Sequence, residues 1–163
     1  MKRNKKRSLP YRKGVGVVLL NKKNEIFVGR RIDDEEFDAW QMPQGGINKN
    51  ETPIKAAFRE LKEETGVMKK DVKILSVSKN WLYYDLPKNL IKKVFKGKYK
   101  GQKQKWYIMR FYGKNHKINI QTENPEFQNW KWTPSRKLKN IIVSFKKKLY
   151  REILKEFEGI IGR

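Results

Sequence analysis

The chain has 163 residues, of which 40 are lysine or arginine and 17 are aspartate or glutamate, so its formal net charge is +23. This length fits one domain, and an aromatic content of 12% can supply a hydrophobic core. The absence of cysteine excludes disulfides, thiolate zinc sites and a cysteine nucleophile, and a single histidine, His116, excludes a multi-histidine metal site.

The positive charge favours a partner that carries phosphates, because basic side chains displace the counterions condensed on a polyanion. A codon bias toward lysine is the alternative origin of this charge. No segment approaches the run of about 20 apolar residues that crosses a bilayer. The basic start also lacks the apolar stretch of a secretory signal, so we expect a cytoplasmic protein that does not bind membranes.

The first half of the chain predicts two strands and a helix. Residues 1–12 are basic and aperiodic, and we expect a basic extension over residues 1–10 followed by one domain over residues 11–163. A β-branched run from Val15 to Leu20 predicts a buried strand, and residues 26–31 predict its return after a turn. Residues 32–46 are typical of a polar loop punctuated by glycine and proline.

A helix is predicted from Thr52 to Thr65, with Thr52 as its cap, Pro53 in the first turn and Gly66 in the left-handed conformation that ends a helix. Residues 72–84 alternate like a strand, and residues 85–103 form a basic surface excursion with little periodicity.

The second half predicts two more strands and a final helix. Residues 104–113 form a strand with Trp106 and Ile108 on one face and Tyr107 and Met109 on the other, and residues 126–133 form a short strand. Apolar residues recur every fourth position from Ile141 onward, which indicates an amphipathic C-terminal helix. Strands interspersed with helices predict a single α/β domain built on a mixed sheet.

The helix over residues 52–65 carries the most informative pattern. Glu60, Glu63 and Glu64 fall on one face at i, i+3 and i+4, where their carboxylates repel one another unless a cation neutralises them. Hard oxygen ligands favour Mg²⁺ or Mn²⁺ over zinc. The alternative is a solvated helix face, on which Arg59 relieves the repulsion by reaching Glu63. Gly45 and Gly46 let backbone amides approach anions ahead of the helix.

These residues resemble a known family motif. The segment 45–67 matches the Nudix box GX5EX7REUXEEXGU without a gap or exception, where U is an aliphatic residue. The matching residues are Gly45, Glu51, Arg59, Glu60, Leu61, Glu63, Glu64, Gly66 and Val67. The resemblance implies an α/β/α sandwich around a mixed β-sheet and hydrolysis of nucleoside diphosphates linked to another group.

The resemblance also implies roles for the residues of the box. The metal is expected to be held by carboxylates of the helix: Glu60, Glu63 and Glu64. Arg59 and Glu51 would orient these carboxylates, which places Arg59 among the catalytic residues. Gly45 would shape the loop beside the metal, and Gly66 has a structural role at the end of the helix.

Segments outside the box resemble the bacterial RNA pyrophosphohydrolase subfamily, whose members are also described as dinucleoside polyphosphate hydrolases and invasion-associated proteins. These segments are Trp40–Asn48, Asn80–Pro87, Gly101–Trp106, Pro125–Trp132 and Val143–Phe157. The extension Met1–Pro10 and the stretch Lys92–Lys100 are least similar, and we assign them no role. The resemblance implies that the enzyme removes pyrophosphate from the 5′-triphosphate end of RNA.

Subfamily resemblance adds one metal ligand and a set of substrate contacts. Glu126 is expected to join the metal cluster, although it also fits an ordinary strand-edge carboxylate. The general base stays open between Glu60, Glu64 and Glu126. Arg31 and Phe145 would sandwich the first base, although Phe145 also fits the hydrophobic core. The remaining candidates would bind phosphate: Arg12, Lys103 and Lys105. Lys103 and Lys105 also fit a solvated strand end.

Three functions therefore compete. The first is the metal-dependent removal of pyrophosphate from triphosphorylated RNA, which promotes mRNA decay. The second is hydrolysis of dinucleoside polyphosphates such as Ap4A or Ap5A, because both substrates present a nucleoside followed by a phosphate chain. The third is a basic RNA-binding module whose carboxylate helix is inert. DNA specificity is not expected.

Overall fold

The computed structural model describes residues 8–32 and 39–162. Its strands are β1 (Tyr11–Leu20), β2 (Ile26–Arg31), β3 (Trp40–Gln41), β4 (Gln44–Gly46), β5 (Val72–Val77), β6 (Leu82–Asp85), β7 (Gly101–Phe111) and β8 (Phe127–Thr133). Its α-helices are α1 (Pro53–Thr65), α2 (Lys88–Ile91), α3 (Ser135–Leu138), α4 (Lys147–Glu156) and α5 (Glu158–Ile161). Single 3₁₀ turns are η1 (Lys69–Asp71), η2 (Phe95–Gly97), η3 (Asn115–Lys117) and η4 (Ser144–Lys146).

The sheet is mixed, as predicted. Its central path runs β3-β2-β1-β7-β5, with β8 paired to β2, β4 to β1 and β6 to β7. The long strands β1 and β7 are parallel from the pair Tyr11–Gly101 to the pair Leu20–Arg110, and the other pairs are antiparallel. This parallel pair forms the centre of the sheet, so its β-branched and aromatic residues are buried on both faces.

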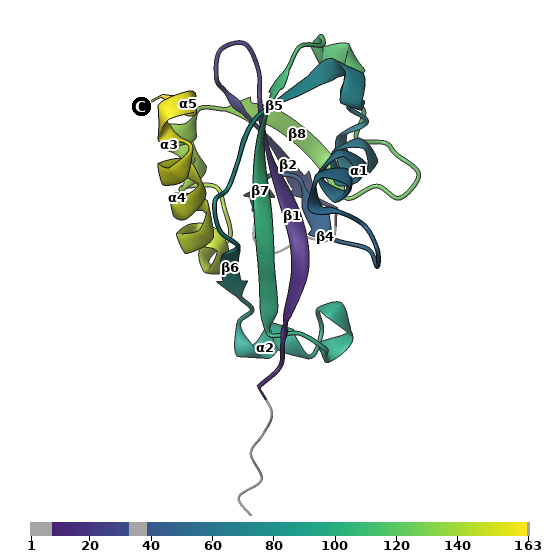
Figure 1. The fold of residues 1–163 in the computed structure, drawn as a ribbon, viewed down its shortest axis with the longest axis vertical. Helices are drawn as coiled ribbons and strands as arrows, with labels where there is room; N and C mark the ends of the chain where they lie inside the picture. The colour runs from purple at the N-terminus through teal and green to yellow at the C-terminus, as the bar shows by residue number, and fades with distance from the viewer. Residues whose placement is uncertain (1–7, 33–38, 163) are drawn as a thin grey trace, which may run out of the picture.

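Helices cover the two faces of the sheet (Figure 1). On one face, Val18, Trp106 and Ile108 pack in a cluster with residues of α3, α4 and α5. On the other face, Val17 and Met109 pack against α1. The predicted division of residues 104–113 between two faces is confirmed, and so is the α/β/α sandwich.

Helix α1 begins and ends as predicted. The Thr52 hydroxyl accepts a hydrogen bond from the Lys55 N–H, and Pro53 occupies the first turn. Gly66 has φ 73°, a left-handed conformation, and its N–H donates to the Lys62 carbonyl. These caps fix where α1 starts and stops, and thereby which of its residues face the loop that precedes it.

Two strand predictions need correction. Strand β1 starts at Tyr11, four residues earlier than predicted, because its parallel partner β7 supplies hydrogen bonds that a basic, aperiodic sequence does not reveal. Residues 72–84 form two strands rather than one. A register shift between Ile74 and Ser76 leads to a break after Val77, and Ser78 then donates its N–H to the Trp106 carbonyl.

Two further predictions also differ from the structure. The excursion over residues 85–103 contains α2, η2 and the start of β7, and apolar side chains within it, Ile91, Val94 and Phe95, pack against the core. The C-terminal helix starts at Lys147 rather than Ile141, because Phe145 lies in the separate turn η4. The apolar positions before Lys147 therefore match the helical period without being helical.

Some predictions concern residues that the structure does not describe. Residues 1–7 of the predicted extension, and residues 33–38 of the predicted loop, are not described. The domain boundary after residue 10 stays a prediction. No helix within residues 8–32 and 39–162 combines the length and the apolar character needed to cross a membrane.

Candidate active site

Strand β4, which precedes the loop into α1, brings glycine backbone against an acidic side chain. Residue 45 pairs with Val15 of β1, which fixes the backbone of β4 on the sheet. A Cβ atom at Gly45 would lie 2.2 Å from the Glu60 carboxyl carbon, so a side chain at this position would displace that carboxylate. Gly45 is therefore required by the close approach of α1 to β4.

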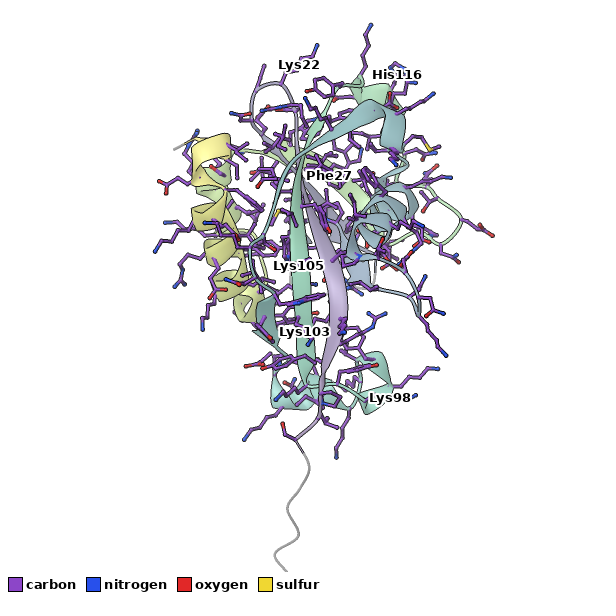
Figure 2. All side chains as sticks on the ribbon, viewed as in Figure 1. Lys22, Phe27, Lys98, Lys103, Lys105 and His116 are labelled. Carbon is purple, nitrogen blue, oxygen red and sulfur yellow. The ribbon has the colours of Figure 1, made fainter. Side chains whose placement is uncertain are left out.

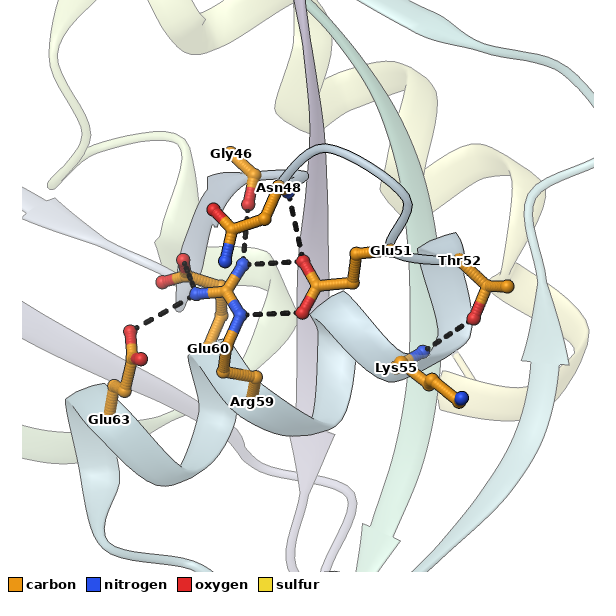
Figure 3. A network of polar contacts seen from close by, with 8 residues as sticks. All are labelled: Gly46, Asn48, Glu51, Thr52, Lys55, Arg59, Glu60 and Glu63. Carbon is orange, nitrogen blue, oxygen red and sulfur yellow. Dashed lines mark hydrogen bonds and ion pairs between the residues drawn. The ribbon is translucent and has the colours of Figure 1, made fainter.

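Arg59 is the centre of a network that orders this loop (Figure 3). Its guanidinium binds both Glu51 carboxylate oxygens, at 2.7 and 2.8 Å, and donates to the Gly46 carbonyl at 2.8 Å. It also reaches Glu60 at 2.7 Å and Glu63 at 3.2 Å. The bidentate hydrogen bonds from Arg59 lower the pKa of Glu51 to about 2. Arg59 thus contacts two carboxylates of α1, and the orienting roles of Arg59 and Glu51 stay a prediction.

Two carboxyl groups of α1 are buried together. Glu64 is 4% exposed, and its carboxylate accepts the Gln44 N–H at 3.1 Å. Burial raises the pKa of Glu64 well above its ordinary value, and the nearby Glu60 charge raises it further. Burial also raises the pKa of Glu60, against the lowering effect of Arg59. Arg59 partly compensates the charge of Glu60, and the charge of Arg31 lowers the pKa of Glu64, against the larger effect of burial.

The donor set fits a divalent cation. Four carboxylates line one cavity, and Glu126 raises the pKa values of both Glu60 and Glu64 through its charge. Within residues 8–32 and 39–162, however, no three acidic or histidine side chains lie closely enough together to hold an ion. Arg59 binds Glu60 and Glu63. Binding a hard cation would relieve the repulsion among these oxygen ligands.

The cavity that holds these carboxylates has a volume of about 450 Å³ and brings together most of the predicted site. Predicted residues in its lining are Arg12, Arg31, Gly45, Glu60, Glu63, Glu64, Glu126 and Phe145. A larger cavity of about 660 Å³ lies between α3 and α4, but it holds none of the residues of the box. The smaller cavity is therefore the candidate active site.

Arg12 is held at the cavity wall by a segment to which the sequence assigned no role. Its guanidinium carbon lies 4.8 Å from the centre of the Phe95 ring. Phe95 and Lys96 have φ values of 53° and 57°, and Gly97 follows at 70°. Left-handed backbone at two non-glycine residues is costly and concentrates at functional sites. Val94 and Phe95 of the stretch Lys92–Lys100 thus line the cavity, together with Leu90 from earlier in the same excursion.

Lys103 and Lys105 do not join the cavity. Gln102 and Gln104 alternate with them along β7, and these two glutamines are buried on the cavity side of the strand. Because successive residues of a strand point to opposite faces, the two lysines point away from the cavity. The predicted binding of phosphate by Lys103 and Lys105 therefore stays a prediction for the opposite face of the sheet.

Lys146 is a cavity residue that the sequence did not reveal. It is 6% exposed, its ammonium donates to Gln41 at 3.3 Å, and it lies 5.2 Å from the centre of the Tyr84 ring. Burial, and then the charge of Arg31, lowers the pKa of Lys146 to about 8. Lys146 is the first of three consecutive lysines, and no sequence signal distinguishes the buried one from Lys147 and Lys148.

The buried charge of Lys146 predicts a trade of stability against activity. The fold favours neutral Lys146, whereas the unfolded chain keeps it protonated up to about pH 10.5. We expect Lys146→Met to raise the free energy of unfolding at pH 7 by about 1–3 kcal/mol and to lower kcat/KM. The gain should shrink by pH 9.5, where Lys146 of the parent protein is already neutral. Urea denaturation at pH 7 and pH 9.5 measures the gain in the free energy of unfolding. An equal gain at both pH values would contradict the prediction.

The NUDIX domain family matches residues 10–153. The chain belongs to the Nudix family. Similar curated proteins include the RNA pyrophosphohydrolases of Rickettsia typhi and Rickettsia prowazekii. Each is 52% identical over 158 residues, and the alignment covers 97% of this chain and 96% of the relative. The resemblance of the Nudix box is thereby confirmed, and this protein is a Nudix hydrolase that acts on phosphoric anhydride bonds.

Solved structures confirm the Nudix fold. The Caenorhabditis elegans Ap4A hydrolase in a binary complex matches with a TM-score of 0.67 at 22% identity, covering 91% of this chain and 99% of that chain. The Escherichia coli dihydroneopterin triphosphate pyrophosphohydrolase matches with a TM-score of 0.67 at 18% identity, covering 90% and 99%. At these identities the likeness concerns the architecture of the Nudix domain.

Proposed function

We propose that this Nudix hydrolase removes pyrophosphate from the 5′-triphosphate end of RNA, leaves a 5′-monophosphate, and so promotes mRNA decay. The observation that carries the proposal is one cavity lined by both acidic and basic groups. Its carboxylates come from α1 and from Glu126, and its cations are Arg12, Arg31 and Lys146. The 52% identity to RNA pyrophosphohydrolases supports the same substrate.

The basic residues of the cavity would bind and orient the substrate. Arg12 and Lys146 carry charges that suit the phosphate chain, and Lys146 is held by Gln41. Arg31 and Phe145 line the same cavity, and a guanidinium plane and an aromatic ring stack on any base. Phe145 also packs against the core, which holds its ring 5.9 Å from that of Tyr84. Stacking and core packing are therefore compatible for Phe145.

Acidic residues would hold the metal and accept a proton from the attacking water. The ligands that we propose for Mg²⁺ or Mn²⁺ are carboxylates of the cavity, with Gly45 beside them: Glu60, Glu63, Glu64 and Glu126. A bound divalent cation neutralises phosphate charge and lowers the pKa of water. Buried Glu64, with its raised pKa, is suited to accept a proton, and Glu60 and Glu126 stay alternatives for this role.

A dinucleoside polyphosphate hydrolase is the second candidate function. Ap4A and triphosphorylated RNA both present a nucleoside followed by a phosphate chain, and the cavity offers the same groups to each. Cytoplasmic location stays our prediction for either function.

Product analysis separates these functions. With Mg²⁺, we expect 5′-triphosphorylated RNA to be converted to 5′-monophosphorylated RNA and pyrophosphate, or to two phosphates in succession, and no conversion after chelation of the metal. Ap4A at equal concentration should turn over more slowly. A clear preference for Ap4A would favour the second function, and absence of hydrolysis of both substrates would favour an inert RNA-binding module.

A further inference from the structure

The face of the sheet opposite the cavity carries aromatic rings and lysines side by side. We call it the lysine–aromatic face and define it by six residues: Tyr11, Trp81, Tyr83, Lys100, Lys103 and Lys105. Tyr83 is 47% exposed, and the remaining five are partly buried. Figure 2 shows Lys103 and Lys105 along the half of the sheet that lies toward Lys98, far from Lys22.

Strand register explains how these residues share one face. Lys103 of β7 lies opposite exposed Lys13 of β1 on one side and opposite Tyr83 of β6 on the other. One row further, Gly101 lies between Tyr11 and Asp85. Because Gly101 has no side chain, the Tyr11 hydroxyl reaches across it and donates to the Asp85 carboxylate.

The rings of this face are held in place and accompanied by ammonium groups. Tyr11 and Tyr83 pack edge to face, with centroids 4.9 Å apart at 74°. The Lys100 ammonium lies 4.6 Å from the centre of the Tyr11 ring, and those of Lys103 and Lys105 lie 5.7 and 5.6 Å from the centre of Trp81. This arrangement alternates flat apolar surfaces with positive charges over three strands.

The charges of the face have no acidic partners. Within residues 8–32 and 39–162, Lys13, Lys100, Lys103 and Lys105 form no ion pair with a carboxylate. Asp85 accepts the hydrogen bond from Tyr11 instead. Three ammonium groups beside partly buried rings, with exposed Lys13 and Tyr83 next to them, are complementary to a single-stranded nucleic acid, because phosphates bind the ammonium groups and bases of any sequence stack on the rings.

We propose that the lysine–aromatic face binds the single-stranded body of the RNA whose 5′ end occupies the cavity. The identity of the ligand as RNA rests on the proposed function. The same strands serve both sites, since Arg12, Tyr84 and Gln102 line the cavity while their chain neighbours belong to the opposite face. Among the described strands β6 pairs with β7 alone, so it is an edge strand, and α4 and η4 contact it.

The test compares long and short substrates in face variants. Tyr83→Ala and Lys103→Glu are made separately, with Lys22→Glu as the charge-matched control at the far end of the molecule. We expect kcat/KM for a triphosphorylated RNA of about 20 nucleotides to fall about tenfold in each face variant, through KM. The value for a triphosphorylated dinucleotide should stay within about twofold, because so short a substrate does not reach the face.

A binding measurement separates this proposal from the proposed function. A 5′-hydroxyl RNA of about 20 nucleotides lacks the triphosphate, and its affinity should fall about tenfold in both face variants and stay unchanged in Lys22→Glu. Failure of the parent protein to hydrolyse RNA would overturn the proposed function alone. Equal losses on long and short substrates would show that the variants disturb the cavity, and unchanged RNA binding and hydrolysis would show that the face does not bind RNA. Either result would overturn the proposal.

Discussion

Replacement of Glu64 by glutamine is expected to lower kcat on triphosphorylated RNA by about a hundredfold or more, while the affinity for RNA is retained. Glu64 is buried against Glu60, and glutamine removes the charge that suits a metal or a proton. The amide keeps the shape of the side chain and an oxygen that can accept the Gln44 N–H. Single-turnover kinetics with saturating RNA measure the loss directly.

Stability measurements show whether the loss at Glu64 is chemical rather than structural. Burial raises the pKa of Glu64, so its charged form destabilises the fold at neutral pH, and the neutral amide should not lower the melting temperature without metal. Mg²⁺ should raise the melting temperature of the parent protein, and less so that of Glu64→Gln. Exposed Glu123 lies outside the cavity lining, and Glu123→Gln serves as the control. Full activity of Glu64→Gln would contradict the proposed site.

Replacement of Gly45 by alanine is expected to abolish most activity without unfolding the protein. The new Cβ atom would lie 2.2–2.4 Å from the carboxyl group of Glu60, so that group must move by about 1 Å. A displacement of this size costs about a hundredfold in rate when it misplaces a catalytic group. The displaced atoms are at the end of a flexible side chain, which keeps the effect on the free energy of unfolding small.

Gly159→Ala is the matched control for Gly45→Ala. A Cβ atom at Gly159 meets nothing within 4 Å, so the same chemical change is made without a steric contact. We expect the control to keep its activity, and thermal melting should give similar midpoints for both variants. A Gly45→Ala protein as active as the control would mean that the position of the Glu60 carboxylate does not matter for turnover.

The helix that carries the Nudix box was predictable because its signals are local. Thr52, Pro53 and Gly66 define its ends through backbone hydrogen bonds and backbone conformation within one or two turns. The spacing of Glu60, Glu63 and Glu64 follows from helical periodicity alone. The contact of Arg59 with Glu63 was predictable for the same reason, whereas its contacts with Gly46 and Glu51 depend on the path of the loop.

The strand and helix bounds that were predicted wrongly depend on pairing or packing with distant parts of the chain. Tyr11 belongs to β1 because β7, some ninety residues later in the chain, pairs with it. The apolar residues before Lys147 share the spacing of the C-terminal helix, yet Phe145 lies in a turn beside Tyr84. The predicted phosphate contacts of Lys103 and Lys105 stay a prediction, and the alternation of β7 places the two lysines on the face opposite the cavity.

By itself, the sequence determined the family, the mixed α/β architecture and the acidic helix, because these depend on residue order and on periods of a few residues. Only the tertiary structure decided that Lys146 is buried in the cavity and that Phe95 holds Arg12 at its wall. It also decided which face of the sheet Lys103 occupies. The burial of a side chain and the face of the sheet on which it lies depend on which distant segments pack together. The residues next to a lysine in a basic chain indicate neither property.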